Sequence, residues 1–200
     1  TVVFFNAADA AFVAVFDYHN EAPGWCEHIA TYQCLPTPEW TTWKQHDQQW
    51  MTQYAFAEFL EQRAFDLAPQ DDDHPRQPTA ADMIEIARRI EAVKTTRIGS
   101  GQNLSDGTVS LQFVEEATTT AVGSSTTVQI PEAFDLGIKV FRGGDAYRIR
   151  ARFGYRFNAK EGTQMRYWLI NPDNVYRDAA LAQRTVIAAD IGGPLYDGSR

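Results

Sequence analysis

The chain has 200 residues, of which 44% are hydrophobic and 22% charged, and its formal net charge is −8. These values are typical of one globular domain with a substantial hydrophobic core. The acidic balance argues against a protein that wraps nucleic acid or binds anionic lipid over its whole surface. No segment approaches the roughly 18 apolar residues of a membrane span, so we expect no membrane partner.

The beginning of the chain and its cysteines indicate the compartment. The chain starts at Thr1 and has no basic segment followed by an apolar stretch, so no signal peptide is visible and a processed or partial chain is indicated. Its two cysteines, Cys26 and Cys34, are not needed as a disulfide staple in a chain of this length. We expect a reducing, cytoplasmic setting.

Three apolar segments lie near the N-terminus. Residues 1–5 are β-branched and aromatic and predict a strand, and residues 29–35 predict another. The apolar run 10–16 fits a strand and a helix equally well. Between these segments, Pro23 and Gly24 mark a turn.

Three helices are predicted next, and each begins at a threonine. Thr37 and Thr79 are the expected caps of the first and third helices, and the second helix is expected to run from about Thr52 to Phe65. Thr79 is followed three residues later by Asp82, which is a variant of the capping box. The acidic, proline-flanked segment 70–78 separates the second helix from the third and is expected to be a loop.

The composition changes near Gly99. Segments 108–120 and 124–130 are rich in threonine and valine and broken by glycine, which predicts strands joined by a turn. Near the end of the chain, Asn171 and Pro172 predict the cap and first turn of a closing helix that runs to about Ile191. The residues after this helix are expected to fray.

Together these elements predict an α+β fold. An antiparallel β meander is expected in the C-terminal half, with helices from the N-terminal half and a closing C-terminal helix. We expect one domain over residues 1–200. The composition shift leaves an alternative of two subdomains, a helix-rich 1–98 and a 99–200 that is β-rich and carries the terminal helix.

The segment 147–157 alternates between apolar or aromatic residues and basic residues, and Gly154 is the one interruption in the basic set. Because successive side chains of a strand point to opposite faces, one face is expected in the core. The other face carries Arg148, Arg150, Arg152, Gly154 and Arg156. If residues 158–162 form a hairpin loop, Phe157 pairs with Thr163, and the returning strand adds Arg166 and Trp168 to the basic face.

Three interpretations of this basic face are open. The arginines pair with carboxylates of the same sheet, for which Glu115 and Glu116 are candidates. Alternatively they contact another protein, because arginine and aromatic residues are enriched at interfaces. A third interpretation is single-stranded nucleic acid, whose bases stack on aromatic rings and whose phosphates pair with arginine.

The other candidate groups of residues give weak or no indication of a metal site or a catalytic site. Cys26, His28 and Cys34 are weak candidates for zinc because their spacing matches no standard finger. The cluster 71–74 lacks the spaced ligands of a calcium loop. No nucleophile, metalloprotease or phosphate-loop motif is present. We therefore expect no enzyme and no cofactor. The four tryptophans at positions 25, 40, 43 and 50 predict either a stacking platform or core residues.

Five motifs of the chain occur together: Pro23-Gly24-Trp25 with His28, Thr37-Pro38-Glu39-Trp40 with Trp43, Gln53 before Phe56-Ala57-Glu58-Phe59-Leu60-Glu61, Ile130-Pro131-Glu132 before Phe134, and Tyr155-Arg156. In this combination they resemble the YfdQ-like family of uncharacterised phage and prophage proteins. The resemblance extends from about residue 17 to residue 191. It implies a phage-derived protein in the cytoplasm of a bacterial host cell, and it implies no activity.

Three functions are compatible with this sequence. We expect first a non-enzymatic protein that self-associates into a symmetric homo-oligomeric ring or shell, because an acidic chain with a local basic strand offers complementary surfaces to its own copies. The alternative is an accessory protein of phage DNA metabolism that binds single-stranded nucleic acid through the basic hairpin. A hydrolase of unknown substrate is the third.

Overall fold

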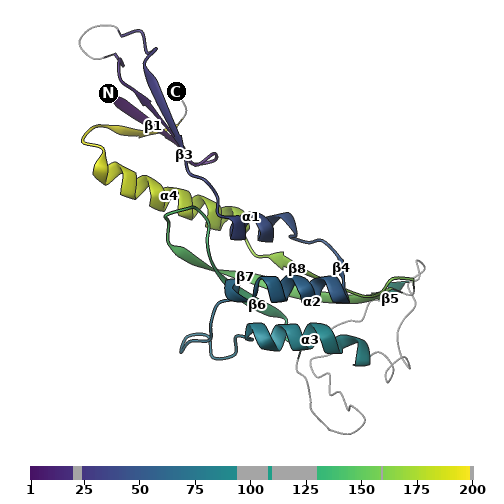
Figure 1. The fold of residues 1–200 in the computed structure, drawn as a ribbon. Coiled ribbons are helices and arrows are strands. Elements are labelled where there is room, and N and C mark those ends of the chain that lie inside the picture. Colours follow the sequence, from purple (N-terminus) through teal and green to yellow (C-terminus); the bar gives the residue numbers. More distant parts are fainter. Residues whose placement is uncertain (20–23, 94–107, 110–129, 159, 199–200) are drawn as a thin grey trace. The chain divides into compact units, whose positions relative to one another are not determined.

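A computed structural model describes residues 1–19, 24–93, 108–109, 130–158 and 160–198. Its elements are labelled in Figure 1. The chain divides into two compact units, of which unit 1 holds residues 1–42, 139–147 and 171–200, and unit 2 holds 43–138 and 148–170. Each unit combines segments from both halves of the sequence, and the single-domain organisation stays a prediction.

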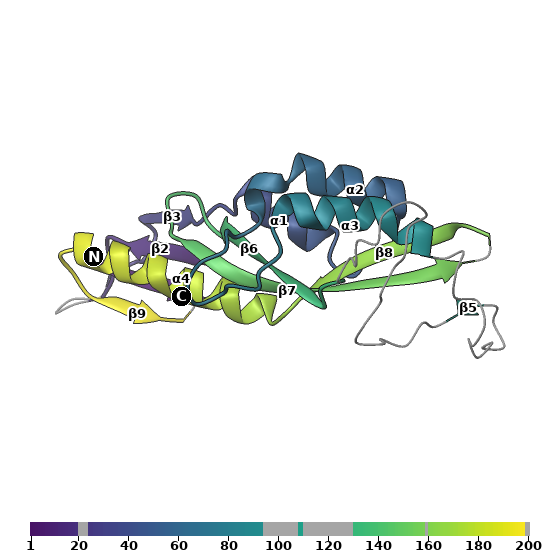
Figure 2. The same ribbon diagram turned by 90° about the horizontal axis from the view of Figure 1, so that it is seen from below.

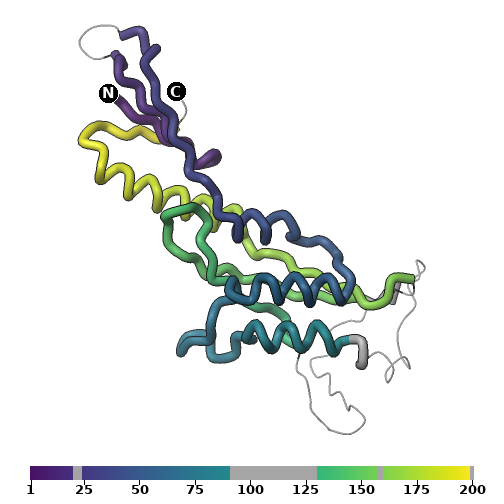
Figure 3. The backbone as a smooth tube through the Cα atoms, in the orientation of Figure 1, coloured from purple at the N-terminus to yellow at the C-terminus, as the bar shows by residue number. Residues whose placement is uncertain are grey.

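Unit 1 contains a four-stranded sheet in the order β3-β2-β1-β9. The chain trace in Figure 3 shows its N-terminal strands beside the segment that ends the chain. Neighbouring strands are antiparallel except β9, which runs parallel to β1. The bounds are β1 Val2–Asn6, β2 Ala11–Val15, β3 Ile29–Gln33 and β9 Leu195–Asp197.

The long helix α4 (Pro172–Asp190) is the other large element of unit 1. Its Tyr176 contacts two aromatic rings, with centroid distances of 6.4 Å to Trp40 and 4.9 Å to Phe141. Toward its C-terminus, Arg184 forms an ion pair with Asp197 of β9 at 2.6 Å. These contacts connect the helix to residues in each of the three chain segments that make up unit 1.

Unit 2 is built on a five-stranded sheet in which β4, β8, β7 and β5 follow one another and β6 also pairs with β7. Helices α2 and α3 lie on the same side of the β7–β8 hairpin (Figure 2). The strands are β4 Met51–Thr52, β5 Thr108–Val109, β6 Ala133–Lys139, β7 Ala146–Asn158 and β8 Gly162–Leu169. The helices are α1 Pro38–Gln45, which spans the boundary of the two units, α2 Gln53–Gln62, the 3₁₀ turn η1 Ala64–Asp66, and α3 Ala80–Val93.

The predicted caps at Thr37 and Thr79 are confirmed, and the structure shows a third threonine cap at Thr52. Thr37 Oγ1 accepts a hydrogen bond from the Trp40 N–H at 3.2 Å, and Thr52 Oγ1 accepts one from Ala55 at 3.3 Å. Before α3, Asp82 N–H donates to Thr79 Oγ1 while the Thr79 N–H donates to Asp82 Oδ2 at 2.9 Å. Each cap satisfies backbone N–H groups that the first helical turn leaves without partners.

An aromatic cluster forms the centre of unit 2. Trp43 and Tyr167 are fully buried, and their ring centroids are 4.9 Å apart in an edge-on arrangement. Both polar atoms of this pair are satisfied, because Trp43 Nε1 donates to Asp66 at 2.8 Å and the Tyr167 hydroxyl donates to the Trp43 carbonyl at 2.7 Å. Burial raises the pKa of Tyr167, with a further contribution from the Asp47 charge.

The predicted α+β fold is confirmed, including the antiparallel C-terminal hairpin and the closing helix. The run 10–16 is the strand β2. Of the strands predicted at 108–120 and 124–130, only Thr108–Val109 lies within the described residues, where it forms β5. None of the helices in the described part of the chain combines the length and apolar character that a membrane span requires.

Three local predictions need correction. Asn171 precedes α4 with a φ of 51°, but its side chain makes no capping hydrogen bond. After α4, Leu195–Asp197 is ordered as β9 because it pairs with β1, where the Val3 N–H also donates to the Pro194 carbonyl at 3.1 Å, whereas residues 199–200 lie outside the described residues. Strand β6 was not predicted, although its Phe134, Leu136 and Ile138 are buried.

The buried Tyr167 hydroxyl gives a prediction about stability. Replacing Tyr167 by Phe leaves the Trp43 carbonyl without its donor in a dry environment, so we expect the free energy of unfolding to fall by about 1–2 kcal/mol. Urea denaturation measures this change. Tyr54→Phe is the control because Tyr54 is 78% exposed; equal stability of the two variants would contradict the buried role of the hydroxyl.

Candidate interaction surfaces

The hairpin register predicted from the sequence is confirmed. Arg152 lies opposite Trp168, Gly154 opposite Arg166, and Arg156 opposite Gln164. Residues directly opposite in an antiparallel pair share a face. We call this set the cationic face, and its members are Arg148, Arg150, Arg152, Gly154, Arg156, Gln164, Arg166 and Trp168.

The reverse face of the same hairpin belongs to the core. Its members Ile149, Ala151, Phe153, Met165, Tyr167 and Leu169 are all buried. Helices α2 and α3 cover this reverse face of β7–β8, where Phe56 of α2 contacts Phe153 at 5.5 Å between ring centroids. The cationic face therefore points away from the helices of its own unit.

Arg148 is held by an intramolecular ion-pair network. Its guanidinium contacts Asp71 at 2.5 Å and the buried Asp135 at 3.3 Å, and it donates to the Pro69 carbonyl at 3.0 Å. The pKa of Asp71 is lowered, first by the hydrogen bond from the His74 side chain and then by the His74 backbone N–H and the Arg148 charge. This arginine binds the loop before α3 and is not available to a partner.

Arg156 and Arg166 are held against Trp50. The guanidinium carbons lie 4.2 Å and 4.4 Å from the Trp50 ring centroid, within the range of cation–π contacts. Arg156 Nε also donates to Gln164 at 2.8 Å. A base that stacked on Trp50 would have to displace these cations, so the face is less suited to base stacking than its composition predicts.

Gly154 makes room for Trp168. A Cβ atom at this position would lie 2.9 Å from Cζ3 of the indole, closer than van der Waals contact allows. The indole therefore lies against the strand where the row of arginines is interrupted. Arg166 lies 5.2 Å from the same ring, and its Nε is buried and has no hydrogen-bond partner among the described residues.

Arg150 and Arg152 are the remaining basic residues of the cationic face. Both are exposed, and neither forms an ion pair within the described residues. Glu115 and Glu116, the acids proposed from the sequence as their partners, lie outside the described residues. Of the predicted site residues, Arg150 and Arg152 are therefore the ones that the described structure leaves available as charges.

The cation–π contacts of Trp50 with Arg156 and Arg166 were not predicted from the sequence. The connection depends on β4, which is two residues long and pairs Met51 with Met165 and Thr52 with Gln164. Of the other tryptophans, Trp40 and Trp43 are buried, as expected for core residues. Trp25 is 85% exposed and does not belong to the core.

A second surface lies at the edge of the unit 1 sheet. All five residues of β3 are exposed, and β3 ends the order of described strands in this sheet. Large apolar side chains flank or belong to it, with exposed fractions of 57% for Phe16, 85% for Trp25, 49% for Ile29, 53% for Tyr32 and 55% for Leu35. An unpaired edge bordered by apolar groups favours pairing with another strand.

The hydrogen bonds of β3 determine which backbone groups remain free. The Cys34 N–H donates to Ala10 and the Phe16 N–H donates to His28, both at 2.9 Å, so the even-numbered residues of this segment bond to β2. Hydrogen-bonded and non-hydrogen-bonded pairs alternate along an antiparallel ladder. The N–H and carbonyl groups of Ile29, Thr31 and Gln33 therefore point outward from the sheet.

An apolar hollow of about 570 Å³ adjoins this edge. The small residues Ala14 and Ala30 line it, together with Ile187 of α4 and Ile191, the residue that follows this helix. Phe12, Phe16 and Tyr32 also line it. It contains few polar groups, so it suits an apolar side chain rather than a charged ligand.

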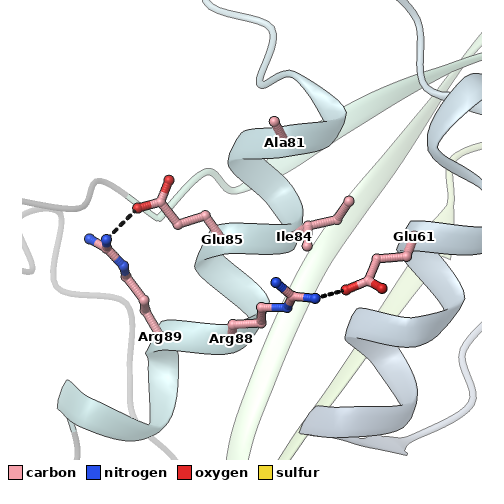
Figure 4. A pocket seen from close by; sticks show the side chains of 6 residues that line it. All are labelled: Glu61, Ala81, Ile84, Glu85, Arg88 and Arg89. Atoms are coloured by element: carbon pink, nitrogen blue, oxygen red, sulfur yellow. Dashed lines mark hydrogen bonds and ion pairs between the residues drawn. The ribbon is translucent and has the colours of Figure 1, made fainter.

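A different hollow, of about 500 Å³, lies beside α2 and α3 in unit 2 (Figure 4). Its charged side chains satisfy one another, because Arg88 pairs with Glu61 across the two helices and Arg89 pairs with Glu85 along α3. This is the helix-surface pairing expected from the i, i+4 spacing of Glu85 and Arg89. The hollow offers no free charge for a ligand.

The weak zinc candidates do not assemble a site. Cys26 Sγ lies 3.8 Å from Nε2 of His19, and Cys34 is buried elsewhere, where burial raises the pKa of its thiol. Among the described residues, no group of three or more histidine, cysteine or acidic side chains is arranged to bind a metal.

The difference between Arg148 and Arg152 can be tested by matched substitutions. Arg148→Gln leaves Asp135 buried without its cationic partner, so we expect a loss of about 2–3 kcal/mol in the free energy of unfolding. Arg152→Gln removes the same charge from an exposed position of the same strand and should change stability by less than about 0.5 kcal/mol. Chemical denaturation distinguishes them, and equal losses would refute the structural role of Arg148.

Comparison with known proteins gives a family and no further relative. No protein of curated function and no solved structure matches the chain. A family model described as "Uncharacterized conserved protein (DUF2303)" matches residues 1–199. Because this match covers nearly the whole chain, the protein belongs to the DUF2303 family.

Proposed function

We propose that this protein is a non-enzymatic, phage-derived protein that self-associates into a symmetric homo-oligomeric ring or shell in the bacterial cytoplasm. The phage origin and compartment follow from the resemblance to the YfdQ-like phage and prophage proteins. Self-association is supported chiefly by one observation, the exposed strand β3, which ends the order of the described strands in its sheet and has large apolar neighbours.

The size of the apolar surface around β3 supports a protein partner. With about 200 Å² for each large side chain, the exposed fractions of Phe16, Trp25, Ile29, Tyr32 and Leu35 amount to roughly 600 Å². One partner in a standard interface contributes about 800 Å². These five side chains alone would therefore supply most of one partner's share, before the backbone of the edge strand is added.

The charge distribution favours a copy of the same chain as the partner. The net charge is −8, whereas Arg150 and Arg152 present exposed positive charge on one strand. Acidic surface of one copy and the cationic face of the next are complementary, and such heterologous contacts close into rings. We therefore assign the cationic face to contacts between copies.

The contribution of β3 can be tested with a proline. Thr31→Pro removes an N–H that points outward from the sheet and leaves the hydrogen bonds to β2 in place, so the fold should persist. We expect the dissociation constant of the assembly to rise roughly ten-fold or more, measured by sedimentation velocity over a concentration series.

Thr31→Ala is the control for this experiment, because it keeps the N–H and should associate like the wild type. Circular dichroism checks that both variants are folded. Unchanged association of folded Thr31→Pro would contradict a contact through the edge of β3.

A second candidate function is binding of single-stranded nucleic acid. The specific observation in its favour is that Arg150 and Arg152 are exposed and form no ion pair within the described residues, with Trp168 opposite Arg152. Phosphates would pair with the guanidinium groups and a base would stack on the indole. The acidic net charge and the engagement of Trp50 by two arginines make this the weaker candidate.

The nucleic-acid candidate predicts a salt dependence. For an oligo-dT, Arg150→Gln with Arg152→Gln should reduce the slope of log K against log salt by about 1.4, because each of the two arginines would neutralise one phosphate and so contribute about 0.7. The control Arg76→Gln with Arg177→Gln removes the same charge from exposed positions outside the cationic face. Absence of binding by the wild type at low salt, or equal slopes for both variants, would exclude this function.

A further inference from the structure

We propose that β3 pairs antiparallel with β3 of a second copy, in a two-fold arrangement centred on Thr31 that places Tyr32 of each copy at the open side of the other copy's apolar hollow. This inference rests on the proposed self-association and specifies its geometry. It follows from three features of unit 1: the direction of the free backbone groups, the alternation of side chains along β3, and the position of the hollow.

The free backbone groups restrict the register. Because Ile29, Thr31 and Gln33 point their N–H and carbonyl groups outward, these odd-numbered residues must form the hydrogen-bonded pairs of a new antiparallel ladder. Centring the ladder on Thr31 pairs all five residues of β3, with Ile29 opposite Gln33 of the copy. This alignment forms about six interstrand hydrogen bonds, two for each hydrogen-bonded pair. Any shift by two residues forms fewer.

The same register pairs a large side chain with a small one. Ala30 falls opposite Tyr32 of the copy, in a non-hydrogen-bonded pair where side chains approach most closely. Within one copy, Ala30 pairs with Ala14, and Ala14 pairs with Val3. Tyr32 of the copy thus extends a cross-strand row that consists of small or medium side chains.

This row crosses the apolar hollow. Val3, Ala14 and Ala30 all line it, and Tyr32 and Phe12 border it on the neighbouring row. Because the row has only methyl-sized side chains on β2 and β3, no large side chain of this row separates the hollow from the edge at which the copy's Tyr32 would lie. The ring of Tyr32, now 53% exposed, would lose much of its contact with water there.

The contact is isologous, since each copy gives the same strand and receives the same tyrosine. A two-fold contact alone closes at two copies. In a larger ring or shell it must be combined with a second, different contact, and the cationic face with its exposed Arg150 and Arg152 is the surface that the described structure offers for that role.

The register is tested by disulfide cross-linking of single cysteine variants. In the proposed alignment Thr31 lies opposite itself at a Cα separation of about 5.5 Å, which a disulfide can span. Gln33 lies opposite Ile29, so the two Gln33 positions are about 14 Å apart, which is beyond disulfide reach. Under mild oxidation, Thr31→Cys should give at least ten-fold more covalent dimer than Gln33→Cys on a non-reducing gel.

Gln33→Cys is a matched control because Gln33 belongs to the same strand, projects to the same face and is also exposed. The native Cys26 and Cys34 are buried and not joined by a disulfide, and both are present in each variant, so they contribute equally. The double variant Ile29→Cys with Gln33→Cys should regain the cross-link, because the register places these two positions opposite each other.

Tyr32 has its own test. Tyr32→Ala should weaken self-association at least ten-fold in sedimentation velocity, whereas Tyr54→Ala, which truncates a tyrosine that is 78% exposed on α2, should leave it unchanged. An oligomeric wild type without preferential Thr31→Cys cross-linking would overturn the register and leave self-association standing. A monomeric wild type would overturn both.

Discussion

The alternation of side chains across the β7–β8 hairpin is the constraint on which unit 2 depends. One face carries buried residues such as Phe153 and Tyr167, and the opposite face carries five arginines. Because side chains alternate with a period of two, a slip of one residue in this register would place guanidinium groups against α2 and α3. On the core face the buried Tyr167 hydroxyl donates to the Trp43 carbonyl, and on the opposite face Arg148 of β7 forms ion pairs with Asp71 and Asp135.

Most of the positive charge on the cationic face is used inside the molecule. Arg148 holds the loop before α3, and Arg156 and Arg166 lie over Trp50. Arg150 and Arg152 therefore remain exposed in unit 2. In unit 1, the odd-numbered residues of β3 similarly point their backbone N–H and carbonyl groups outward. Unpaired strand edges and exposed aromatic groups are costly in an isolated molecule because they promote association. A specific contact between copies would turn both features into parts of one assembly.

Local patterns in the sequence were sufficient for the hairpin and the helix starts. The alternation in 147–157 and the capping threonines act over two to four residues, so they are visible without the fold. Features that depend on distant pairing were not predictable. Trp50 reaches the cationic face through a two-residue strand, Arg148 meets Asp71 and Asp135, and Leu195–Asp197 pairs with β1. Asn171 matched a capping pattern, yet its left-handed backbone, with a φ of 51°, precedes α4 without a side-chain cap.

Self-association is tested most directly by the mass of the wild-type protein in solution. Size-exclusion chromatography with multi-angle light scattering, run over a range of micromolar concentrations, should give a single species whose mass is an integer multiple of the single-chain mass. Negative-stain electron microscopy of the same peak should then show closed particles of uniform size. A monodisperse monomer across the whole range would contradict the assembly, and the cationic face would then serve only contacts within the chain.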